Sequence, residues 1–212
     1  MPRRTTDYRG LTELSRVRLL GAVQQGPDRT LKDLAEAVGL HINTARDHLG
    51  VLIDEGLVSA RPQPSGMRGR PPTVYRAVDD AEMNPAAKSR IERAKALGPV
   101  LARVGYSCVP ESVRRLGDGA GEQFDALVDH LDDSGLEPVA DDTGLGIALA
   151  ACPHLELVGD ERTMACAVHA RLLHDVLAQV PGPLRVAEVQ PFLTATTCEL
   201  RLQTTGHQTQ PA

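Results

Sequence analysis

Two predicted helices separated by one short turn set the tightest limit on how this chain can fold. The first helix lies in "TLKDLAEAVGL", where Thr30 is a typical N-cap residue and Asp33, three positions later, completes a variant of the capping box. Gly39 is expected to end it, because glycine adopts the left-handed conformation at a helix C-terminus without strain. The second helix, in "HINTARDHLGVLIDEGLV", follows at once, so the pair is predicted to form a helix-turn-helix.

Apolar residues at helical spacing predict a small core for this region. A preceding helix is predicted in "LTELSRVRLLGAVQQG", which stops at Gly26 and Pro27. The second helix of the helix-turn-helix has one apolar and one polar face. The residues expected to be buried on its apolar face are Ile42, Ala45, Leu49, Leu52 and Ile53.

The polar face of that helix carries residue types that read DNA. Asn, Arg, Thr and His side chains can hydrogen-bond base edges or phosphates from a helix in the major groove. A solvated helix face has the same composition, so this face alone leaves both interpretations open. The predicted DNA contacts from this helix are His41, Asn43, Thr44, Arg46 and His48.

The next segment favours the DNA-binding interpretation. "LVSARPQPSGMRGRPPTVYRAV" predicts a strand over 57–61, a flexible turn, and a strand over 73–78. A basic hairpin tip directly after a recognition helix is a wing, and its Arg68 and Arg70 are expected to reach the DNA backbone or the minor groove. Charge agrees: the chain up to Arg76 has twelve Lys and Arg against eight Asp and Glu, whereas the remainder has eleven against twenty. A polyanion-facing module followed by an acidic domain is therefore expected.

Residues 11–78 resemble the winged helix-turn-helix of the ArsR-like and MarR-like bacterial regulators, and "GRPPTVYR" is especially typical of one ArsR-like group. The resemblance implies a double-stranded DNA-binding domain over 8–80. The N-terminus "MPRRTTDYRG" lacks the apolar segment of a secretory signal, and no apolar run is long enough for a membrane helix, so a cytoplasmic location is expected.

A helix predicted over 84–107 follows the wing. In winged-helix regulators a helix at this position often pairs two subunits, and two half-sites need two modules, so a homodimer is expected. The alternative is a helix that packs only within its own chain. Pro99 should kink or divide the helix.

The acidic half predicts a small α+β domain over 110–204, in the order helix, strand, helix, strand, strand, with an antiparallel sheet. The polar tail 205–212 is expected to be disordered. The fold class of the whole chain is therefore predicted to be α+β: a winged helix-turn-helix, a linker helix and a sensor domain.

Three of the four cysteines and one histidine follow the pattern C-x13-C-x2-H-x28-C in this domain. Cys166 and His169 lie one helical turn apart, while Cys152 and Cys198 are placed at a strand end and in the last strand. Soft thiolates select iron–sulfur clusters, zinc or copper(I). The alternative is that these cysteines are small buried apolar residues. His154 and His174 lie nearby but fit the pattern less well.

"CPHLELVGDERTMACAVHARLLHDVL", followed by "VQPFLTATTCELRL", resembles the C-terminal domain of the SufR-like regulators, ArsR-related repressors of iron–sulfur assembly genes. The resemblance implies a 4Fe-4S cluster bound by Cys152, Cys166 and Cys198, with His169 the candidate fourth ligand and zinc the alternative cofactor. Cys108 lies outside the pattern and is interpreted as structural.

The predicted function is a DNA-binding regulator, a repressor, whose operator affinity depends on that cofactor. A winged-helix regulator with a structural zinc site or a small-molecule pocket is the alternative. No phosphate-binding Gly-rich loop, HExxH or GxSxG motif is present, so an enzyme is not expected.

Overall fold

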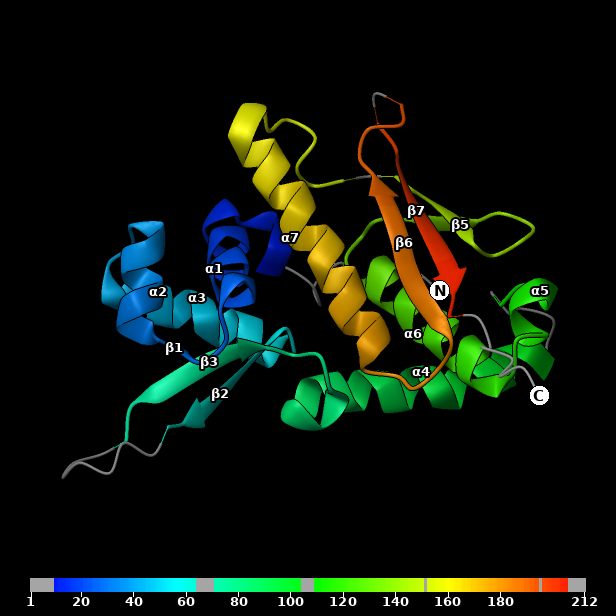
Figure 1. Cartoon of the computed structure of the whole chain (residues 1–212), viewed down its shortest axis with the longest axis horizontal. Helices are drawn as coiled ribbons and strands as arrows, with labels where there is room; N and C mark the ends of the chain where they lie inside the picture. The colour runs from blue at the N-terminus through cyan, green and yellow to red at the C-terminus, as the bar shows by residue number, and fades with distance from the viewer. Residues whose placement is uncertain (1–9, 64–70, 104–108, 151, 195, 206–212) are drawn as a thin grey trace, which may run out of the picture.

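The computed structural model describes residues 10–63, 71–103, 109–150, 152–194 and 196–205. Within these ranges the chain forms a winged helix, a long connecting helix and an α+β domain (Figure 1). The predicted α+β class is confirmed. None of the helices in the described ranges has the length and apolar character needed to span a bilayer. Arg68, Arg70 and Cys108 lie outside the described residues, as does the predicted tail beyond residue 205.

The N-terminal part contains the helices η1 (Gly10–Thr12), α1 (Leu14–Gln25), α2 (Leu31–Val38) and α3 (Ile42–Asp54). Thr30 caps α2 as predicted: its hydroxyl accepts a hydrogen bond from Asp33 N at 3.3 Å, and its own backbone N donates to Asp33 Oδ2 at 3.0 Å. Gly39 has a φ of 68°, the left-handed conformation that ends α2. The predicted helix-turn-helix is therefore confirmed together with its local causes.

The prediction that Ile42 of α3 is buried was wrong. Ala45, Leu49 and Leu52 are buried, but Ile42 is 39% exposed. Ile42 is the first residue of α3, so it precedes the buried stripe by one turn and has few neighbours to pack on.

The wing is a three-stranded antiparallel sheet of order β1-β3-β2, made of β1 (Arg29–Thr30), β2 (Val58–Pro62) and β3 (Thr73–Ala77). The two strands of the hairpin agree with the prediction to within one residue. β1 was not predicted, because a strand of two residues carries no alternation to recognise.

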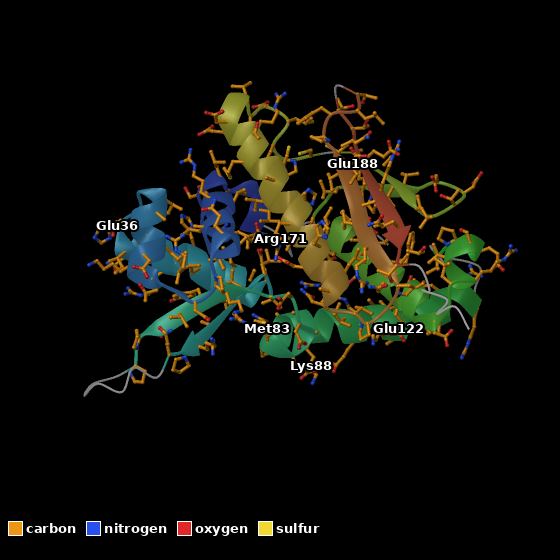
Figure 2. The ribbon with its side chains drawn as sticks, viewed as in Figure 1. Glu36, Met83, Lys88, Glu122, Arg171 and Glu188 are labelled. Atoms are coloured by element: carbon orange, nitrogen blue, oxygen red, sulfur yellow. The ribbon has the colours of Figure 1, made fainter. Side chains whose placement is uncertain are left out.

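Helix α4 (Pro85–Arg103) leaves the wing and runs along α6, and Lys88 marks its first turns in Figure 2. Contrary to one predicted outcome, α4 is not divided at Pro99. A proline inside a helix removes one backbone hydrogen bond, and the turns on either side keep theirs. Residues 104–107 of the predicted helix lie outside the described residues.

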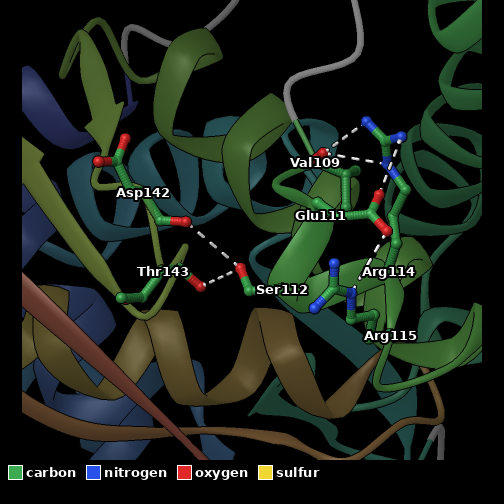
Figure 3. Close-up of polar contacts among 7 residues, drawn as sticks. All are labelled: Val109, Glu111, Ser112, Arg114, Arg115, Asp142 and Thr143. Carbon is green, nitrogen blue, oxygen red and sulfur yellow. Dashed lines mark hydrogen bonds and ion pairs between the residues drawn. The ribbon is translucent and has the colours of Figure 1, made fainter.

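The C-terminal part contains α5 (Glu111–Arg114), α6 (Asp118–Asp133) and α7 (Gly159–Ala178) beside a four-stranded antiparallel sheet of order β4-β5-β7-β6. The strands are β4 (Pro138–Ala140), β5 (Gly146–Leu149), β6 (Leu184–Gln190) and β7 (Cys198–Thr204). Only the short elements α5 and β4 were not predicted. The Ser112 hydroxyl joins α5 to the β4–β5 turn by donating to Thr143 O at 2.6 Å (Figure 3).

Helix α7 also packs against α1 of the winged helix, so buried apolar residues of both halves form one continuous cluster. Contact is close: a Cβ added at Gly21 of α1 would lie 2.8 Å from Val168 Cγ2. Gln24 Nε2 donates to Val168 O at 3.3 Å, and Gln179 Nε2 donates to Val78 O at 2.8 Å. The DNA-binding part and the acidic part are thus joined along the length of α7.

Asp175 is a buried carboxylate at this junction, next to Arg171, which lies on α7 (Figure 2). Burial raises the pKa of Asp175 to about 6, although the Arg171 guanidinium opposes the shift. The folded state therefore binds more protons than the unfolded state between about pH 4 and 6, and stability is lost as pH rises through this window.

Replacing Asp175 with Asn should raise the free energy of unfolding at pH 7 by about 2 kcal/mol, and the gain should vanish near pH 4. Urea unfolding at both pH values measures it, and an equal gain at pH 4 would contradict the explanation.

Candidate functional site

The recognition helix presents its polar residues to solvent. His41, Asn43, Thr44 and Arg46 are exposed on the first turns of α3, and His48 is half-buried. Arg46 Nη1 donates to Asn43 Oδ1 at 2.8 Å, and His41 Nδ1 accepts from Asn43 N at 3.3 Å as the N-cap. These contacts hold a donor fork and an amide side by side, the groups that bind guanine and adenine edges.

The base of the wing carries two arginines that sequence reasoning missed. Arg61 of β2 and Arg76 of β3 both donate to Asp28 Oδ2, at 2.9 and 3.1 Å. The hydrogen bond from Arg61 is the main reason that the pKa of Asp28 lies below its usual value. Asp28 reaches them because its own N–H donates to Tyr75 O at 3.1 Å, a tertiary contact without a sequence signal. The arrangement keeps two cations on the wing beside α3.

A second site lies in the α+β domain, where the predicted ligands meet. Cys152 follows β5, Cys166 is on α7 and Cys198 begins β7, and all three are free and half-buried. All three line one cavity of about 60 Å³, together with His154 and His169. The four residues of the C-x13-C-x2-H-x28-C pattern are therefore brought to one place. We call this space the cysteine cavity.

The remaining wall of the cysteine cavity is apolar and comes from both halves of the chain. Its C-terminal side includes Leu136, Leu149 and Val189. Its N-terminal side includes Leu11 and Val17, which belong to the winged helix. No feature of the sequence pointed to these two residues, because their part in the site depends on the packing of α1 against α7.

His169 offers a nitrogen with no other use in the described part of the structure. Its Nε2 is buried and has no hydrogen-bond partner there. Burial, and then the nearby His154, lowers the pKa of His169 to about 4. The imidazole is therefore neutral at physiological pH, the form in which histidine binds metals. An unpaired buried polar atom is costly, so a ligand at Nε2 would remove a real deficit.

The thiols affect one another across the cavity. Burial raises the pKa of the Cys152 and Cys166 thiols, and Cys198 raises both further, whereas Arg162 lowers both and the His154 backbone lowers that of Cys152. Three thiols and a neutral imidazole form a soft donor set. Among the described residues, however, no group of three or more His, Cys, Asp or Glu side chains is arranged to hold a metal ion.

One zinc ion needs its four donors within about 2.0–2.3 Å of a single point. An iron–sulfur cluster has several irons, each with its own protein ligand, so its cysteines surround a larger space. Thiolate and imidazole are donor types that both groups use.

Residues 14–59 match the family model of winged helix-turn-helix DNA-binding domains. The matched range runs from the start of α1 into β2, so it includes the whole helix-turn-helix. The N-terminal part of the chain is therefore a winged helix-turn-helix DNA-binding domain, and the match supports a DNA-binding transcriptional regulator. Searches of curated proteins and of solved structures found no match.

Proposed function

We propose that this chain is a transcriptional repressor whose operator affinity is set by an iron–sulfur cluster at Cys152, Cys166 and Cys198, with His169 as the fourth ligand. The observation that carries the proposal is the composition of the cysteine cavity. Three thiols and an unpartnered imidazole line one side of it, and Leu11 and Val17 of the DNA-binding domain line another. The candidate ligands and two residues of the DNA-binding domain thus line the same cavity.

The coupling follows from the helices that meet there. Val17 lies on α1, which contacts α2, α3 and α7. His154 and Leu11 line the same cavity, so the segment after Cys152 lies beside the winged helix. When bound, a cluster would supply an iron- and redox-sensitive link between the cysteine-bearing segments. A shift of Cys166 or Val168 would move α1, and with it the orientation of α3.

The proposal also predicts a dimer, because a two-fold operator requires two recognition helices. The N-terminal half of α4 is buried within its own chain through Ala87, Ile91 and Ala94. Its C-terminal half instead exposes Leu97, Val100 and Leu101, at 45, 52 and 38%. We assign the subunit contact to these three residues, which form the apolar patch of α4.

Replacing Val100 with Asp should dissociate the dimer at micromolar concentration, since it places a charge in the contact. Sedimentation velocity measures the change, and the matched control is Ser89→Asp, which adds the same charge to an exposed position in the N-terminal half of α4. A wild-type protein that sediments as a monomer and protects a single unrepeated half-site would rule the dimer out.

A small-molecule pocket is the second candidate, because apolar side chains make up most of the cavity wall. A single preparation of the protein distinguishes the two candidate functions. Protein made anaerobically with iron should be brown, absorb broadly in the visible and contain acid-labile sulfide if the first proposal is correct. Colourless protein without iron or zinc, whose DNA binding is unaffected by oxygen, would favour the pocket.

A further inference from the structure

One side chain contacts all three segments that carry the cysteines. Arg162 lies on α7 four residues before Cys166, so both residues project from the same face of the helix. Both also line a second cavity, next to Val189 and Phe192. We propose that Arg162 is a positioning residue that holds the segments of Cys152, Cys166 and Cys198 at a fixed separation. The reason for holding the cysteines in place rests on the proposed function, whereas the contacts that Arg162 makes do not depend on it.

The first contact is with the segment that follows Cys152. The guanidinium donates from Nε to Leu157 O and from Nη2 to Leu155 O, the second at 3.2 Å. Within the turn itself, Leu155 N donates a hydrogen bond to Cys152 O at 3.3 Å, and Leu157 N donates one to His154 O at 3.1 Å. The segment is neither helix nor strand, and besides the chain itself and the packing of Cys152 and Leu157 on the core, these two bonds from Arg162 attach it to α7.

The second contact is with the turn that precedes Cys198. The Arg162 guanidinium carbon lies 4.5 Å from the centroid of the Phe192 ring, a cation–π distance. Phe192 has a φ of 57°, a conformation that bulky residues rarely adopt. In this conformation its N–H donates to Cys198 Sγ at 3.5 Å. Arg162 therefore stabilises the strained residue whose backbone orients the third thiol.

Arginine suits this role because of its shape. A planar guanidinium donates two hydrogen bonds in a fixed fork and stacks on an aromatic face at the same time. A lysine ammonium is a compact charge without that planar face, so it can keep one carbonyl contact but not the whole arrangement. Arg162→Lys should therefore retain only part of the positioning.

The test measures thiol separation in reduced, metal-free, full-length protein. Dibromobimane becomes fluorescent only when both of its arms have alkylated thiols, and mass spectrometry of peptides identifies the bridged pair. Arg162→Ala should lower the rate of bridging between Cys166 and either other cysteine, relative to the rate of single alkylation by monobromobimane, about ten-fold, because tethered groups that move independently have a lower effective concentration. The ratio removes the effect of Arg162 on the pKa of the thiols. Arg162→Lys should fall between the two. Arg201→Ala is the matched control, since it removes an exposed arginine of β7 that pairs only with Glu199 among the described contacts.

A second variant keeps the test decisive if Arg162→Ala does not fold. Phe192→Leu removes the ring but leaves both carbonyl contacts, so it should slow bridging to Cys198 and leave the Cys152–Cys166 pair unchanged. Circular dichroism confirms that each variant is folded. Bridging rates equal to wild type in folded Arg162→Ala, or in Phe192→Leu, would overturn the proposal. If the wild-type protein binds no iron while the two variants show these changes in bridging, the proposed cofactor is refuted and the positioning role of Arg162 is intact.

Discussion

We expect replacement of Cys152, Cys166 or Cys198 with Ser to remove bound iron and acid-labile sulfide together, and to abolish the proposed effect of iron on operator affinity. A serine hydroxyl is a poor substitute for a soft thiolate, and the three thiols come from three separate segments around one cavity. Losing any one ligand therefore releases the link between those segments. The measurements are iron and sulfide content after anaerobic preparation, and DNA affinity by fluorescence anisotropy with and without oxygen. Each variant should lose most of the bound iron.

Two further variants test the assignment. Cys108→Ser should retain iron and sulfide, because Cys108 lies outside the predicted pattern. His169→Ala should give a labile cluster or a shifted spectrum, since His169 lines the cavity and its buried Nε2 has no hydrogen-bond partner in the described residues. If all four cysteine variants hold as much iron and sulfide as wild type, or if wild type holds none, the cysteine cavity is only part of the packed core.

Alanine at Asn43 or Arg46 is expected to change which operators are preferred, and to weaken binding to the best operator about 10- to 100-fold. Each bidentate contact with a base edge contributes about 1–3 kcal/mol to discrimination, and both residues are exposed on the first turns of α3. Alanine at Arg68 or Arg70 should instead weaken binding to most sequences, and reduce the salt dependence by about one unit per lost phosphate contact. Titrations of an operator library at several salt concentrations measure both effects.

The matched control is Arg115→Ala, which removes the same charge from an exposed position directly after α5, a helix far from α3 in Figure 1. Its operator preference and salt slope should equal those of wild type. Unchanged affinity and selectivity in all four variants of α3 and the wing would refute the assignment of the DNA-binding surface.

Local interactions explain why the DNA-binding fold could be predicted from the residues alone. The Thr30–Asp33 capping box, the left-handed Gly39 and the strands that flank the wing each depend on neighbours a few positions away. Apolar spacing placed the long helices and strands of the acidic half in the same way. The errors fall where these signals weaken: the two-residue β1, the one-turn α5, and Ile42 at the end of a buried stripe.

The sequence by itself determined which residues could be ligands, because Cys and His are the side chains that bind soft metals and they recur at suggestive spacing. Only the tertiary structure decided that the four residues of this pattern line one cavity, and which other residues line it with them. Leu11 and Val17 join the cavity through the packing of α1 on α7, and Arg162 reaches Leu155, Leu157 and Phe192 across chain separations of 7, 5 and 30 residues. Contacts between distant segments depend on how whole elements pack, and residue spacing along one chain carries no record of that packing.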